Sequence, residues 1–174
     1  MNGVADSSAV NEAVESFEVG DPVVHPHHGA GLVVSRRPRR LLGAVRNYLE
    51  IEFPPGLRIM VPCDTADAVG LRAVVGSEGL RRIVEVLGDE AVVVSHNWSV
   101  RQKRYREQLK GGDVLELSAV VRDLAARAAE STLPNSEREL YQRSRGVLAS
   151  ELCYALGVNG ARAAAYIDEH LAAG

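Results

Sequence analysis

The chain has 174 residues, of which 46% are hydrophobic and 5% aromatic, and its formal net charge is −3. This composition predicts a globular protein, in one domain or two small ones, with a core filled mainly by Leu, Val and Ala. No apolar run approaches the ~20 residues that cross a bilayer, and the N-terminal stretch lacks the basic and apolar regions of a signal peptide. We therefore expect a cytoplasmic protein with no membrane partner.

The first half of the chain has the pattern of a β domain. Residues 1–16 are small, polar and acidic, which predicts a disordered N-terminal extension. Over residues 17–69, short runs rich in Val and Ile alternate with prolines, as in a small, strongly bent sheet or barrel. The expected strands are Pro22–His25, Gly31–Val34, Tyr48–Phe53 and Leu57–Val61, with turns at His27–Gly29 and Pro54–Gly56.

After residue 70 the apolar period becomes helical, which predicts a C-terminal bundle of about five short helices over 70–174. Asp113, Ser136 and Asn159 are expected to cap helix N-termini, and Gly111–Gly112 and Gly157 to end helices. The expected helices are Ser77–Leu87, one from Asn97 or Trp98 to about Lys110, and three that follow the capping residues. The predicted fold class is α+β.

Two basic islands stand out against the acidic net charge. The stretch RRPRRLLGAVR (36–46) contains no acid, and HNWSVRQKRYREQLK (96–110) contains a single one. We expect the first island in a hairpin loop that closes through Gly43 and the second on a helix. Each is able to bind a polyanion or an acidic protein surface, or to be an ordinary solvated face.

The sequence does not predict an enzyme. The run His25-Pro26-His27-His28 suggests a metal site, but no Cys, Asp or Glu lies nearby at ligand spacing, so we interpret the run as a structural turn. Cys63 and Cys153 are expected to be free thiols. Neither a nucleophile elbow nor a phosphate-binding glycine loop is present, and we expect no cofactor and no metal.

Trp98 is the single tryptophan of the chain and begins the more basic island. At helical spacing, Arg101, Gln102 and Tyr105 share its face, rather than aliphatic residues. An aromatic ring beside cations is suited to nucleic acid, where the cations hold phosphates and the ring wedges between bases. Spacing alone leaves two interpretations open, a wedge and a core or interface residue.

With these residues in view, the chain resembles the CarD/CdnL family of bacterial RNA polymerase-binding transcription regulators, from about Phe17 to about Leu156. The NWS tripeptide and the GDV…VVRDL stretch, at their observed separation, make the resemblance specific. The stretches that carry it are FEVGDPVVHPHHGAGLV (17–33), VP (61–62) followed by AVGLRAVVGSEGL (68–80), NWS (97–99) and GDVLELSAVVRDL (112–124).

The resemblance implies a Tudor-like, bent β domain that binds a lobe of the RNA polymerase β subunit. It also implies a helical domain that reaches the upstream edge of the transcription bubble. There a tryptophan inserts into the minor groove at the fork, basic residues hold the backbone without sequence preference, and the open promoter complex is stabilised. A monomer that associates with the nucleoid through the polymerase is expected.

Carried over residue by residue, the resemblance gives two sets of contacts. Two departures affect them: Met60 stands where relatives place a second β-contacting arginine, and Val100 replaces a basic residue. Arg58 is expected to replace the arginine that is missing at Met60. Arg104 and Arg106 are expected to compensate for the basic residue that is missing at Val100. The polymerase-binding set is Arg37, Arg39, Leu41, Arg58 and Met60, and the DNA-binding set is Trp98, Arg101, Lys103, Arg104 and Arg143.

Two alternatives of other classes remain. One is a polymerase-docking, protein-interaction module without DNA function, in which Trp98 is packed. The other is a sequence-specific repressor, against which no helix-turn-helix pair with a base-reading polar face is evident. An enzyme is the least favoured class.

Overall fold

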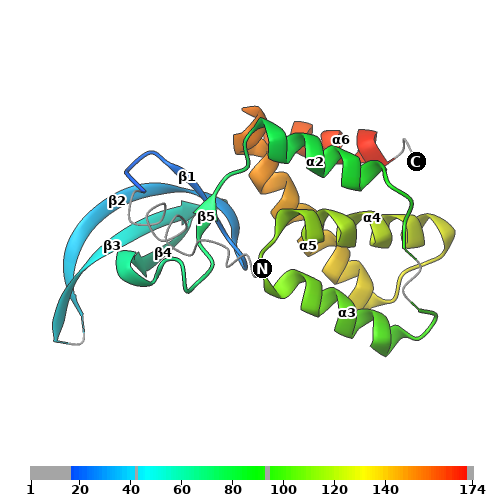
Figure 1. Cartoon of the computed structure of the whole chain (residues 1–174), viewed down its shortest axis with the longest axis horizontal. Coiled ribbons are helices and arrows are strands. Elements are labelled where there is room, and N and C mark those ends of the chain that lie inside the picture. Colours follow the sequence, from blue (N-terminus) through cyan, green and yellow to red (C-terminus); the bar gives the residue numbers. More distant parts are fainter. Residues whose placement is uncertain (1–16, 42, 93–94, 172–174) are drawn as a thin grey trace, which may run out of the picture. The chain divides into compact units, whose positions relative to one another are not determined.

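The computed structural model describes residues 17–41, 43–92 and 95–171, so the extension predicted for residues 1–16 lies outside the described residues. The chain divides into two compact units on either side of the Ala73–Val74 bond. In Figure 1 strands build the first unit and helices the second. The predicted α+β fold, a bent β-sheet followed by a helical bundle, is confirmed.

The first unit is an antiparallel sheet with the strand order β4-β3-β2-β1-β5. Strand β1 pairs with the beginning of β2, and from there on the described part of β2 pairs with β3. The two long strands therefore continue as a curved ribbon (Figure 1). The elements are β1 (Pro22–His25), β2 (Gly29–Leu41), β3 (Ala44–Phe53), β4 (Leu57–Pro62), the 3₁₀ turn η1 (Cys63–Thr65) and β5 (Arg72–Ala73).

Most of the first basic island lies in the two paired strands β2 and β3. A hairpin does turn at Gly43, whose φ is 82°, but the prediction that the arginines of residues 36–40 lie in its loop is wrong. Residues 36–40 pair with residues 45–49 of β3, and β2 ends only at Leu41. Both faces of the ribbon's end are largely exposed, so the sequence lacks the apolar alternation that burial imposes on a strand. Pro38 is tolerated because this part of β2 is at an edge of the sheet.

One face of the sheet carries the core of the β unit. Leu49, Ile51 and Phe53 of β3 are buried there, as the alternation predicts. A Cβ at Gly31 would lie 2.7 Å from the Phe53 ring and 2.7 Å from the carbonyl oxygen of Glu52, so the packing of Phe53 requires a glycine. Their buried partners are Phe17, Val23, Val33, Val61, Ala66 and Leu71.

Both predicted turns of the β unit are confirmed. The amide of His28 donates to the carbonyl of His25 at 3.2 Å, and the amide of Gly56 donates to that of Phe53 at 2.8 Å. Burial and the nearby His28 and His27 lower the pKa of His25, so its ring is neutral at pH 7. That ring lies edge-on to Phe53 with a centroid separation of 6.3 Å, which ties the turn to the core.

The second unit is a helical bundle with two clusters of buried side chains. Ile83, Leu148 and Leu152 belong to the larger one, to which α2, α4, α5 and α6 contribute. Tyr105 and Leu124 belong to the smaller one, which joins α3 to α4. None of the described helices is long and apolar enough to cross a membrane. The helices are α2 (Ser77–Gly88), α3 (Trp98–Lys110), α4 (Val114–Glu130), α5 (Asn135–Leu156) and α6 (Gly160–Leu171).

Most of the predicted helix ends are confirmed. Asp113 and Asn159 accept hydrogen bonds from backbone amides at the starts of α4 and α6, and Gly157 ends α5 with a left-handed φ of 66°. The prediction that Ser136 caps α5 is wrong, because α5 already begins at Asn135 and makes no side-chain cap hydrogen bond. The Ser136 hydroxyl is therefore available for a contact with another helix.

Candidate functional site

The outer face of the sheet brings together the five residues that the resemblance assigns to polymerase binding. Tyr48, Glu50 and Glu52 alternate with the buried residues of β3 and so mark this face. Directly opposed residues of an antiparallel pair share a face. By the strand register, the residues on the Glu50 side are Arg37, Arg39 and Leu41 of β2 and Arg58 and Met60 of β4.

Glu50 binds three of the arginines on this face. One of its oxygens, Oε2, lies 3.2 Å from Nη2 of Arg37 and 3.9 Å from Nη2 of Arg39, and the other lies 3.5 Å from Nη1 of Arg58. The Glu50 side chain is 19% exposed, while those of Arg37 and Arg58 are 55% and 59% exposed. Exposed ion pairs stabilise a fold little, but these three orient long cationic side chains around one point.

The cationic face also offers apolar surface. Leu41 is 43% exposed and Met60 is 41% exposed. Arginine and methionine are among the residues that are enriched at protein–protein interfaces. We call the set of Arg37, Arg39, Leu41, Arg58 and Met60, with Glu50 at its centre, the Glu50 face.

Two further arginines of the first island, Arg36 and Arg40, lie on the opposite face of β2. The fifth, Arg46, lies in β3 directly opposite Arg39 and forms an ion pair with Asp64 at 3.5 Å. Arg36 pairs in register with the buried Leu49, and its Nη1 donates to the Phe17 carbonyl at 3.3 Å and to Glu18 at 2.5 Å. Arg40 is exposed on that same side of the strand. The arginines of the island are thus divided between the Glu50 side of the sheet and the opposite face, where Arg36 ties down the start of the β unit.

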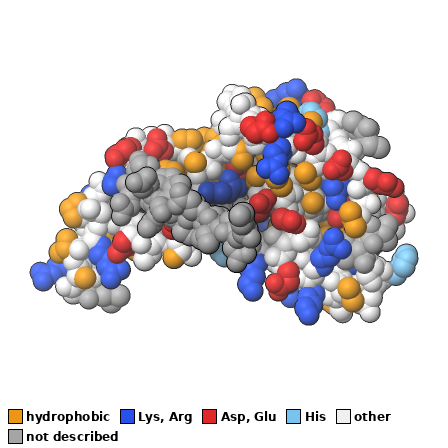
Figure 2. All heavy atoms as spheres, in the orientation of Figure 1, with side chains coloured by type: hydrophobic (Ala, Val, Ile, Leu, Met, Phe, Trp, Pro, Cys, Tyr) orange, Lys and Arg blue, Asp and Glu red, His pale blue; other side chains and the backbone are white. Residues whose placement is uncertain are grey.

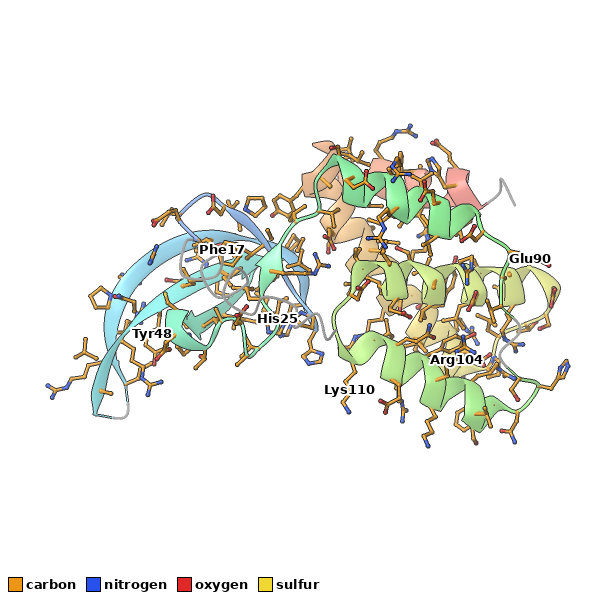
Figure 3. The ribbon with its side chains drawn as sticks, in the orientation of Figure 1. Phe17, His25, Tyr48, Glu90, Arg104 and Lys110 are labelled. Carbon is orange, nitrogen blue, oxygen red and sulfur yellow. The ribbon has the colours of Figure 1, made fainter. Side chains whose placement is uncertain are left out.

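Helix α3 presents its lysines and most of its arginines to solvent, but it turns Arg101 inward. Lys103 and Arg104 are exposed, whereas Arg101 and Tyr105 are 4% and 0% exposed. Figure 3 shows Lys110, at the end of the same helix, extending away from the bundle, and Figure 2 shows Lys and Arg side chains along this edge. The expectation that Arg101 faces DNA is therefore corrected, because its helical face packs into the bundle.

Arg101 is buried because it neutralises a buried carboxylate. Its Nε donates to Oε1 of Glu137 at 2.7 Å, and its Nη1 donates to the carbonyls of Ser95 and His96, each at 2.8 Å. Arg127 of α4 approaches the other Glu137 oxygen at 3.2 Å. Glu137 is fully buried, so these cations compensate the cost of removing its charge from water.

Trp98 lies at the N-terminus of α3 and remains 44% exposed, which excludes a core role. The side chain of Asn97 caps the helix by accepting from the Ser99 amide at 2.9 Å. The indole Nε1 donates to the hydroxyl of Ser136 at 3.1 Å. The ring is thus held at one edge while much of its surface stays open.

Arg143, the DNA-binding residue predicted outside α3, is exposed on α5. It lies seven residues after Ser136, and therefore about 10 Å further along the same side of the helix. Sequence reasoning assigned no contact to Glu50, Ser136 or Glu137. Of these three residues, only Glu50 has a sequence pattern that indicates its surroundings. It alternates with the buried residues of its strand, so it lies on the outer face, where the arginines of the neighbouring strands also lie.

Nothing in the described residues forms a cluster of three or more side chains able to bind a metal, and both cysteines are free thiols. Burial raises the pKa of the Cys153 thiol, so it stays protonated at pH 7.

The chain matches two domain families in succession. Residues 17–75 match the CarD-like/TRCF RID domain, and residues 82–168 match the CarD C-terminal domain. The chain is also 27% identical to "Putative transcription factor YdeB" of Bacillus subtilis (strain 168) over 137 residues, which are 78% of this chain and 90% of the relative. These matches identify the chain as a transcription regulator. The chain belongs to the CarD/CdnL family.

The position of Arg101 yields a first prediction. Arg101→Met should lower the free energy of unfolding of the helical unit by about 3–5 kcal/mol, because it removes the nearest partner of a buried carboxylate. Urea denaturation followed by circular dichroism at 222 nm measures this.

Arg104→Met is the matched control, since it removes an exposed arginine from the same helix and should change stability by about 0.5 kcal/mol or less. Equal stability of the two variants would contradict the buried pairing.

Proposed function

We propose that this protein binds the β subunit of RNA polymerase through the Glu50 face and promoter DNA at the upstream edge of the bubble through α3 and α5. By holding both, it stabilises the open complex. The single observation that carries the proposal is the arrangement of the Glu50 face, where two separate strands supply the five predicted residues within a domain of the CarD-like/TRCF RID family.

The chemistry of the Glu50 face supports an acidic protein partner. Planar guanidinium groups bind carboxylates in a bidentate manner, and Arg37 and Arg58 keep more than half of their side chains exposed for such contacts. Leu41 and Met60 add apolar area that a protein surface can cover. Relatives are expected to have an arginine at the position of Met60. In this chain β4 instead contributes Arg58 as its cation on the Glu50 face.

The arrangement of α3 supports contact with a nucleic-acid backbone. Lys103 and Arg104 are exposed, and Trp98 presents an open aromatic surface at the start of the same helix. Cations of this kind bind phosphates without reading sequence, and an aromatic wedge is suited to a step already unstacked by melting. We therefore assign the wedge to Trp98 and the backbone contacts to Lys103, Arg104, Arg106 and Arg143.

The alternative function is polymerase docking without a DNA wedge. The partial burial of Trp98 favours it, since the residue is only 44% exposed and the rest of its surface is covered by the protein. The two functions predict different effects of removing the Trp98 ring. A wedge function predicts a less stable open complex, whereas polymerase docking alone predicts no change in its stability.

The β-subunit contact predicts that Arg39→Glu together with Arg58→Glu abolishes pull-down of the polymerase β lobe. Charge reversal replaces attraction by repulsion across the interface. Arg40→Glu is the matched control, because Arg40 lies in the same strand on the other face and should leave pull-down intact. Undiminished binding by a folded double variant would remove the β-subunit assignment.

The wedge predicts that Trp98→Ala shortens the half-life of open complexes after competitor challenge while β-lobe pull-down is preserved. A stacking contribution of ~1.4 kcal/mol corresponds to a tenfold change in half-life. The melting temperature should fall little, because Trp98 is outside the core, 44% exposed, and its hydrogen bond to Ser136 is exposed as well. An unchanged half-life would favour the docking alternative.

The backbone contacts predict weak, salt-sensitive DNA binding. If Lys103, Arg104, Arg106 and Arg143 each neutralise one phosphate, log K falls with log salt with a slope of about −3.6 on duplex DNA. Arg104→Gln should reduce the slope by about 0.9 equally on unrelated sequences. Tight binding that is indifferent to salt, or that requires one duplex sequence, would contradict this mode of contact.

A further inference from the structure

Two consecutive residues of α5 bind two residues of α3 that are one helical turn apart. Glu137 accepts from Nε of Arg101 at 2.7 Å, and Ser136 accepts from Nε1 of Trp98 at 3.1 Å. Because residues three apart on a helix are neighbours on one face, the first turn of α5 holds the first turn of α3 at two adjacent points.

The two contacts differ in environment and therefore in what they do. The Arg101–Glu137 pair is buried, and it fixes how α3 and α5 lie against each other. The contact between Trp98 and Ser136 is exposed, and an exposed neutral hydrogen bond contributes little to folding. Its specific effect is on the direction of the indole ring.

The indole ring of Trp98 needs a hydrogen bond such as the one to Ser136 to be held in a single orientation. The torsion between Cβ and an aromatic ring is broad, so an exposed indole samples several orientations unless a partner selects one. Nε1–H is the only donor of the ring, and Ser136 supplies its acceptor. A side chain already held in its bound orientation loses less conformational entropy when it inserts.

We propose that Ser136 is a positioning residue for Trp98, and that the buried Arg101–Glu137 pair sets the spacing at which Ser136 reaches the ring. This rests on the proposed wedge function of Trp98. Ser136 itself need not touch DNA: it acts through the indole Nε1.

The first test needs neither DNA nor polymerase. Trp98 is the single tryptophan, so time-resolved fluorescence anisotropy of the full chain reports on this ring alone. Ser136→Ala should raise the amplitude of the fast, local component, and Ser136→Thr, which keeps a hydroxyl, should restore the slower decay.

Ser99→Ala is the control, since it makes the same change next to Trp98 and leaves the Ser99 amide that Asn97 caps. An unchanged decay in Ser136→Ala would overturn the proposal.

The second test is a double-mutant cycle on open-complex half-life. Ser136→Ala should shorten the half-life about threefold in the wild-type chain and have no effect in a Trp98→Phe background, because phenylalanine has no Nε1. Equal shortening in both backgrounds would overturn the proposal, since Ser136 would then act without the indole.

Failure of the wedge function has a different signature. In that case Trp98→Phe and Trp98→Ala leave the half-life unchanged, while the anisotropy of Ser136→Ala still reports whether the ring is held.

Discussion

The buried carboxylate of Glu137 is the constraint on which the arrangement around α3 depends. A charge without access to water is tolerated only when cations and hydrogen bonds surround it. Here the cations come from two other helices, Arg101 from α3 and Arg127 from α4. The same Arg101 guanidinium holds the backbone carbonyls of Ser95 and His96. The hydrogen bonds and ion pairs of this one carboxylate therefore fix the positions of α3, α4 and α5 relative to one another, and they also hold the backbone at Ser95 and His96, just before Trp98.

The β unit separates core side chains from outward-facing cationic side chains by the alternation of its strands. Leu49 and Ile51 are buried in the core, while Tyr48 and Glu50 of the same strand lie on the outer face. Because residues paired across strands share a face, β2 and β4 show the same alternation as β3. In the first basic island, Arg36 therefore lies on the core side and donates to the Phe17 carbonyl, while the next residue, Arg37, lies on the Glu50 face. Consecutive residues of one strand thereby have different roles: Arg36 stabilises the β unit, and Arg37 is presented to solvent on the Glu50 face.

The sequence predicted the elements with strong local signals and missed the contacts made at long range. The alternation around Ile51 and the capping chemistry of Asp113 are local, and both are observed. The strand over residues 36–40 was read as a loop because an exposed ribbon has no buried face to impose alternation. Arg101 was read as a phosphate contact because nothing nearby in sequence shows that Glu137, 36 positions later, needs its charge.

The carboxylate at the centre of the Glu50 face makes binding there a process of exchange. A carboxylate that approaches Arg37 or Arg58 competes with Glu50, and at Arg58 also with Glu52 at 2.5 Å, so the gain from a new ion pair is offset in part by the weakening of an existing one. Such a surface selects partners by geometry more than by total charge, and it discourages indiscriminate adhesion to acidic polymers. Glu50 also lowers the mutual repulsion of three neighbouring guanidinium groups, so the sheet can carry them side by side on one face without a bound anion.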